Sequence, residues 1–125
     1  MLVEVAIGEV VDKITILQIK LERITDPSRL EDVLTELNIL QNALKSNGIN
    51  VDDEFFQRLK KINETIWDTE DKLRKDDLVV GDFILAARDN AKYNDDRFIV
   101  KNEVNEKYDS LVREQKAHST IYSTD

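Results

Sequence analysis

Acidic side chains at helical spacing are the first residues in this sequence whose arrangement could support chemistry. Glu64, Asp68 and Asp71 are spaced i, i+4 and i+7, so they would share one face of a helix. Glu103 and Glu106 lie one helical turn apart later in the chain. Two such helices facing each other could bind Mg²⁺ through carboxylate oxygens. These five residues are weak candidates for a metal site, and no other metal or cofactor is expected.

A second set of polar residues combines basic side chains with carboxylates from distant parts of the chain. Lys13 and Lys20 are seven residues apart and Arg23 follows one turn later, along one edge of a predicted helix. With bases from other helices they could bind a carboxylate or phosphate, because arginine donates two parallel hydrogen bonds to either group. They could equally form an ion-pair network that fixes helix register or frames a ligand cleft. The candidate residues of this network are Lys13, Lys20, Arg23, Arg88, Arg97 and Lys101 with Asp12, Asn63, Glu64, Glu70, Asp71 and Asp95.

Few other side chains offer chemistry. Trp67 is the only tryptophan and is expected to anchor the core, with ligand stacking as the alternative. His118 is the only histidine and lies in a tail that is predicted to fray, so a Ser-His-Asp arrangement has no credible base. The chain has no cysteine, which excludes disulfides, thiolate nucleophiles and cysteine-ligated zinc.

The composition narrows the fold and the partners. Three glycines and one proline in 125 residues are too few for the many turns of an all-β fold. The net charge of −8 argues against nucleic-acid binding, which needs clustered bases. The longest apolar run, residues 83–87, is far shorter than the ~18 residues that span a membrane. We see no signal peptide either, and we expect a cytoplasmic protein.

Apolar residues at steps of three and four predict the helices that must position these side chains. Asp26 and Pro27 read as the cap and first residue of the second helix, Gly48 as its end, and Asp52 or Asp53 as the cap of the third. A short helix is predicted over residues 83–91, and a separate last helix from the Asn94-Asp95 cap to about Lys116. The stripes are Val10, Ile14, Leu17, Leu21 and Ile24; Leu30, Val33, Leu37, Leu40 and Leu44; Phe55, Leu59, Ile62, Ile66 and Leu73; Phe83, Ile84, Ala87 and Ala91; and Val100, Val104, Tyr108, Leu111 and Val112.

The fold that follows is an all-α antiparallel bundle of about four to five helices, in which short loops place consecutive helices side by side. We expect one domain over residues 1–125, with an extended arm at residues 1–7, where apolar residues alternate, and a frayed tail at residues 118–125. The coiled-coil-like stripes also suit pairing between chains, so a homo-oligomer is expected. Seven acid–base pairs at i, i+4 account for much of the surface charge: Glu9–Lys13, Glu54–Arg58, Asp68–Lys72, Glu70–Arg74, Asp71–Lys75, Glu103–Lys107 and Asp109–Arg113.

Four segments of the sequence resemble one family: GEVVDKITILQIKLERI at 8–24, NETIWDTED at 63–71, FILAARDNAKYNDDR at 83–97 and VKNEVNEKY at 100–108. The family is a group of small bacterial and phage proteins, a domain of unknown function, with the patterns GEL-DKITIL-IK-ERI, NE-LW-IED and ND-R-IK-N. The resemblance implies a helical module found near genes for glycosyltransferases and cell-surface polysaccharides, and no defined activity. Members often carry Ser-Pro where this chain has Ala6 and Ile7, so its first helix lacks a side-chain cap.

These features favour a non-enzymatic bundle that acts by protein contact, as an interaction or accessory module linked to cell-surface glycan synthesis. Its partner would be another protein or a second copy. The alternative is a small all-α enzyme or binding protein for a phosphorylated or carboxylated ligand. A Mg²⁺-dependent nucleotide pyrophosphohydrolase, which pairs ExxE and ExxD motifs, is one such enzyme. The chain has an ExxE at residues 103–106, but the order and spacing of its acidic residues depart from that plan.

Overall fold

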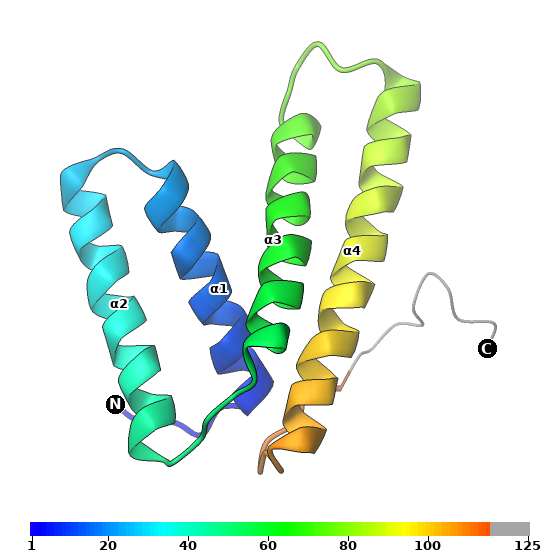
Figure 1. Ribbon diagram of the computed structural model, residues 1–125. Coiled ribbons are helices and arrows are strands. Elements are labelled where there is room, and N and C mark those ends of the chain that lie inside the picture. The colour runs from blue at the N-terminus through cyan, green and yellow to red at the C-terminus, as the bar shows by residue number, and fades with distance from the viewer. Residues whose placement is uncertain (116–125) are drawn as a thin grey trace.

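The computed structural model describes residues 1–115, and within them the chain forms four α-helices and no strand (Figure 1). The helices are α1 (Ile7–Arg23), α2 (Pro27–Ser46), α3 (Asp53–Leu73) and α4 (Val80–Lys107). The predicted all-α bundle is therefore confirmed. Residues 1–6 precede α1 without regular structure. The predicted tail and His118 lie outside the described residues, and the single domain stays a prediction.

The two ends of α2 follow directly from the local sequence. At its start the Asp26 carboxylate accepts a hydrogen bond of 3.0 Å from the N–H of Ser28, and Pro27 occupies the first helical position. At its end Gly48 adopts a φ of 67°, and the N–H of the next residue bonds the carbonyl of Leu44 at 2.9 Å. This geometry is a Schellman motif, so both predicted helix ends are confirmed.

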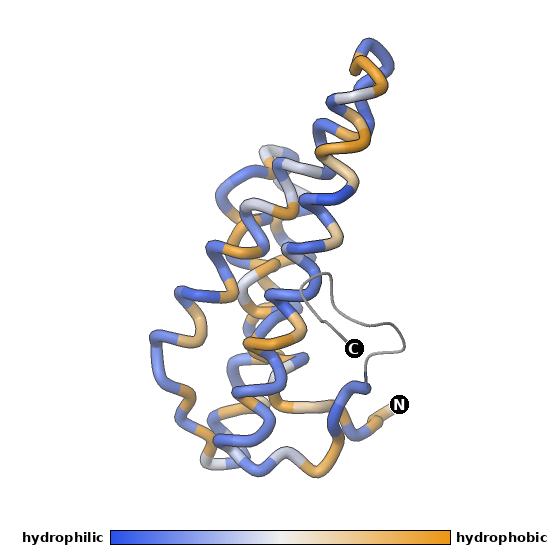
Figure 2. The backbone as a smooth tube through the Cα atoms, turned by 90° about the vertical axis from the view of Figure 1, so that its right-hand side faces the viewer, coloured by the Kyte–Doolittle hydropathy of each residue, from blue (hydrophilic) through white to orange (hydrophobic). Residues whose placement is uncertain are grey.

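Helix α1 lies at the centre of the fold, because it packs against each of the other three helices. Helices α3 and α4 run side by side as an antiparallel hairpin whose closed end extends past α1 and α2 (Figure 1). The orthogonal view in Figure 2 shows this hairpin narrowing to a tip. Among the helices α2 packs against α1 alone, so the expectation that all consecutive helices lie side by side is wrong for α2 and α3. The segment that joins them buries Val51 in the core, and this separates the two helices.

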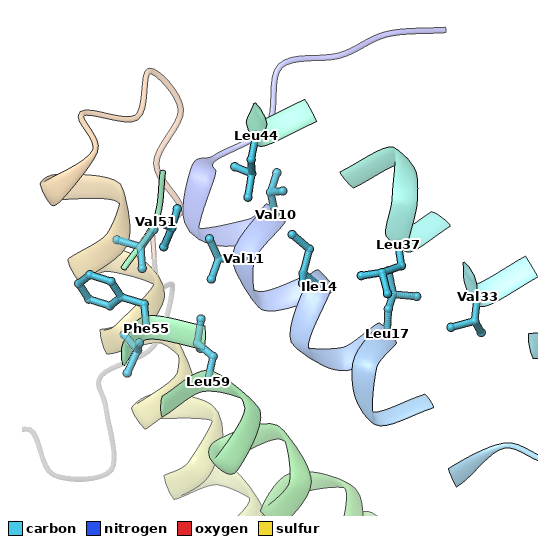
Figure 3. Packing of buried hydrophobic residues seen from close by; sticks show 12 residues of the cluster. Val10, Val11, Ile14, Leu17, Val33, Leu37, Leu44, Val51, Phe55 and Leu59 are labelled. Carbon is cyan, nitrogen blue, oxygen red and sulfur yellow. The ribbon is translucent and has the colours of Figure 1, made fainter. Parts of the chain in front are cut away.

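The core is built mainly from the predicted apolar stripes of α1, α2, the first half of α3 and the end of α4 (Figure 3). The α1 stripe packs against the α2 stripe on one side. On its other side it packs against the first half of α3 and the last turns of α4. Helix α1 also buries Val11 and Ile19, which lie off its main stripe, because a central helix needs more than one buried face. The core cluster consists of Val10, Val11, Ile14, Leu17, Val33, Leu37, Leu44, Val51, Phe55, Leu59, Val100 and Val104.

Helix α4 is one continuous helix, so the prediction of two helices divided at Asn94-Asp95 is wrong. The Asn94 side chain does not cap a helix start, and its amide instead donates 2.9 Å to the carbonyl of Asn90 one turn earlier. Asp95 is buried within the helix. No proline or glycine follows Gly81 in α4, so nothing in its backbone interrupts a helix that α3 supports along its length.

The C-terminal end of α4 comes earlier than the predicted Lys116. Asp109 adopts a φ of 54°, and the N–H of Ser110 bonds the carbonyl of Asn105 at 2.8 Å, which closes the helix as a Schellman-type turn. Aspartate is one of the few residues other than glycine that tolerate this conformation. Leu111, which the sequence assigns to the buried stripe, is therefore 91% exposed.

Candidate functional site: a buried polar network on α1

Asp12 is the centre of a buried polar network between α1, α3 and α4. Its side chain is 1% exposed. The Asp12 Oδ1 atom accepts hydrogen bonds from the Asn63 amide and from Arg97 Nε, both at 2.9 Å, and its Oδ2 atom accepts from the Arg97 guanidinium as a bidentate partner. The Asn63 amide also donates to the Thr15 hydroxyl at 2.9 Å, and that hydroxyl donates to the Asp12 carbonyl at 2.7 Å. The Asp12 carboxylate is therefore satisfied by donors from two other helices.

A second heptad-like stripe on α1 positions this network. Gly8, Asp12, Thr15 and Ile19 step by four, three and four residues, so they share the helix face toward α3 and α4. At Gly8 the helices α1 and α4 approach each other very closely, because a Cβ at this position would lie 2.3 Å from the Lys101 carbonyl oxygen. Only a residue without a side chain fits here, and the close approach lets the short Asp12 side chain reach α4.

The charge of Asp12 is balanced by Arg97, whose side chain is 26% exposed. The hydrogen bonds to Asp12 raise the pKa of the Arg97 guanidinium above its ordinary value, although partial burial opposes them. A buried carboxylate needs such a partner, since an unpaired charge in the interior is very costly. The pair therefore joins α4 to α1 at this position.

The start of α1 is held by α4 and the turn that follows it rather than by its own cap. Ala6 makes no side-chain cap. The first two helical N–H groups, those of Ile7 and Gly8, donate instead to Ser110 Oγ at 3.0 Å and to Asn105 Oδ1 at 2.6 Å. The orphan donors of a helix start are thus satisfied from residues about a hundred positions away in sequence.

Lys101 completes the contact between α1 and α4. Its ammonium lies 2.6 Å from a Glu9 carboxylate oxygen and 2.9 Å from one of Glu114, and its side chain is only 8% exposed. Burial lowers the pKa of Lys101, but hydrogen bonds to the two carboxylates raise it by more, so the pKa lies above its ordinary value. Lys101 is therefore a paired, charged group.

The structure brings together three of the predicted network residues with Asp12. These are Asn63, Arg97 and Lys101, which surround or adjoin it, while Asp95 is buried elsewhere in α4. The other predicted residues lie apart from Asp12. Three of them form ion pairs elsewhere: Lys13 with Glu36 of α2 at 3.7 Å, Arg23 with Asp68 at 2.6 Å and Glu70 with Arg74 at 4.0 Å. Of the remaining four, Lys20 and Glu64 are half-buried, and Arg88 and Asp71 are exposed. Trp67 is half-buried, and the Arg23 guanidinium lies 5.4 Å from the centroid of its ring.

Sequence reasoning missed five members of this network: Glu9, Thr15, Asn105, Ser110 and Glu114. The signal for Thr15 was the second stripe on α1, which runs parallel to the apolar one, whereas Glu9 lies off this stripe. The members on or after α4 carried no such signal, because their role depends on where Gly8 lets the two helices meet.

The acidic residues proposed for a metal do not converge. Asp68 binds Arg23, and Glu103 binds Arg58 at 2.7 Å. Over residues 1–115 no three acidic, histidine or cysteine side chains lie close enough together to hold a metal ion. The same part of the chain has no helix with the length and apolar content needed to cross a membrane.

The polar network is a closed seam rather than the wall of a cleft. A cleft of about 710 Å³ lies between α2 and α3, over Ile14 of α1, with Gln18, Gln41 and Phe56 in its lining. Neither Asp12 nor its partners line it. Because its carboxylates and bases are paired to each other, the network joins α1, α3 and α4 through hydrogen bonds and ion pairs.

The comparisons with known proteins give one match. The model of DUF6165, a family of unknown function, matches residues 1–125. No curated protein and no solved structure is significantly similar to the chain.

Proposed function

Because the chain belongs to this family of unknown function, we propose its role from its geometry: it is a protein-interaction module that acts by contact and not by catalysis. The link to cell-surface glycan synthesis that the family resemblance implies stays a prediction.

The observation that carries this proposal is the apolar surface of the α3–α4 hairpin near its tip. Val80, Phe83 and Ile84 are 75%, 47% and 60% exposed, and Ala87 and Ala91 beside them are also exposed. The sequence predicts a short helix with an apolar stripe here, and among residues 1–115 nothing covers this stripe. We call Val80, Phe83, Ile84, Ala87 and Ala91 the α4 stripe. Contiguous apolar surface on a projecting element is typical of a docking site.

The state of the basic residues weakens the alternative, a protein that binds a phosphorylated or carboxylated ligand. Arg97 and Lys101 already bind carboxylates of this chain, and Arg23 binds Asp68. A ligand anion would have to displace these partners, and at Arg97 it would leave the Asp12 carboxylate buried without its charge partner. The polar network therefore supports stability rather than ligand binding.

Site-specific photo-crosslinking in cells that naturally make the protein tests this proposal. A benzoylphenylalanine is placed at Ile84 in one variant and at Ile39 in another. These two isoleucines form a matched pair, since they are 60% and 61% exposed, and Ile39 lies on α2, away from the α4 stripe. We expect a discrete protein adduct at position 84 and none at position 39. Equal labelling at both positions, or none at position 84, would show that the stripe is not a docking surface.

A further inference from the structure

We infer that the α4 stripe binds a second copy of this chain, with the two α4 helices antiparallel about a two-fold axis. The inference rests on the proposed docking role of the stripe and names its partner.

The spacing and size of the stripe residues carry the inference. Val80, Ile84, Ala87 and Ala91 step by four, three and four residues, which is the spacing of a coiled-coil seam. The large side chains lie at one end of the stripe and the two alanines at the other. In an antiparallel pair Val80 faces the Ala91 position of the second copy, and Ile84 faces its Ala87 position. At these four positions large side chains then meet small ones, which is how well-packed layers fill space.

A parallel pair lacks this complementarity. It would place Val80 on Val80 and Ala91 on Ala91, so bulky groups would crowd at one end and a gap would remain at the other. The antiparallel pair is also self-complementary, as a two-fold interface requires.

The hairpin leaves room for a second copy. Arg97 and Lys101, in the second half of α4, tie this helix to α1 through Asp12 and Glu9. The twelve residues from Val80 to Ala91 therefore extend beyond the body of the fold over about 18 Å of helix. In α4 the only buried residue before Asp95 is Ala86, which faces α3, so one side of the hairpin has no partner among residues 1–115. Figure 2 shows apolar positions continuing to the tip of this hairpin.

The size of the contact predicts a reversible dimer. Val79, which is 62% exposed, adjoins Val80 at the start of the stripe. Burying such partly exposed side chains removes roughly 300 Å² of apolar surface per copy, which corresponds to an interface of roughly 1,000 Å² in total. That is the lower end of the range for specific interfaces. The dimer should therefore dissociate on dilution.

Sedimentation velocity tests whether a second copy binds. At roughly 100 μM the natural chain should sediment as a dimer. Ile84→Glu should be monomeric with unchanged helix content, and Ile39→Glu should behave as the natural chain. A monomer at that concentration overturns the inference, and so does an equal loss of dimer in both variants.

Cysteine cross-linking tests the orientation, because the natural chain contains no cysteine. Val80→Cys and Ala91→Cys are oxidised separately and as a mixture. Disulfides that form in the mixture but in neither single variant support the antiparallel pair, since cross-linked Cα atoms must lie within about 7 Å. Disulfides within the single variants overturn it. A monomeric chain whose position 84 still labels a different protein would overturn this inference alone, whereas an unlabelled position 84 would overturn the proposed function.

Discussion

Replacing Gly8 with alanine tests the contact that brings α1 and α4 together. The added Cβ would lie 2.3 Å from the Lys101 carbonyl oxygen and 2.9 Å from Asn105 Oδ1, and the first of these belongs to the backbone. Relieving this clash requires α1 and α4 to separate, which typically costs about 1–3 kcal/mol. The separation also lengthens the 2.6 Å hydrogen bond from the Gly8 N–H to Asn105, for about 1 kcal/mol more. The higher helix propensity of alanine returns about 1 kcal/mol.

Gly8→Ala should therefore lower the free energy of unfolding by roughly 1–3 kcal/mol. Gly81→Ala is the matched control, because Gly81 is likewise the second residue of a helix, but a Cβ added there would have no atom within 4 Å. It should stabilise the protein by about 0.4–1 kcal/mol. Both are measured by urea unfolding followed by circular dichroism, in an Ile84→Glu background that removes self-association. Equal stabilisation by both alanines would refute the close approach of α1 and α4.

Three further predictions concern charged groups. Arg97→Leu should lower the free energy of unfolding by about 3–5 kcal/mol, because it leaves the buried Asp12 carboxylate without its charge partner. Asp12→Asn should lower it by less, because Arg97 can still reach water. Equal losses in urea unfolding would contradict this asymmetry. The raised pKa of Lys101 means that its pairing stabilises the fold below the unfolded-state pKa and that this stability disappears as pH rises through the folded-state value. The stability difference between the natural chain and Lys101→Met should therefore shrink above about pH 10.5, and a constant difference would argue against the pairing. The Ser28 N–H lowers the pKa of Asp26, so its capping contribution is present at neutral pH and is lost as pH falls through the folded-state pKa. Asp26→Ala should lower Tm more than Asp26→Asn, which keeps a capping oxygen; an equal fall would show that the cap contributes nothing.

The ends of α2 and the buried stripes could be predicted because each depends on neighbouring residues. Asp26 and Pro27 start α2 through groups within two positions, and Gly48 ends it because its own φ of 67° is readily accessible to glycine. The sequence places Asp12 and Arg97 in one polar network, but it specifies neither their pairing nor the burial of Asp12.

Ion pairs between helices could not be predicted from helical spacing. Lys101 of α4, not Lys13, takes the Glu9 carboxylate, and Arg23 of α1, not Lys72, takes that of Asp68. An i, i+4 pair on a solvated helix contributes only a few tenths of a kcal/mol to stability. The carboxylate therefore pairs instead with a base from another helix when that base lies nearer to it or is more buried.

The sequence by itself determined the helical class, most helix boundaries and the apolar faces, because periodicity and capping act over one or two turns. Only the tertiary structure decided that α1 is central, that α4 is unbroken and that the α4 stripe has no partner within residues 1–115. These outcomes depend on how closely Gly8 lets two distant helices approach and on how far the hairpin extends past its neighbours. An apolar stripe in a sequence specifies that a face must be covered, and only the packed fold shows whether the same chain covers it.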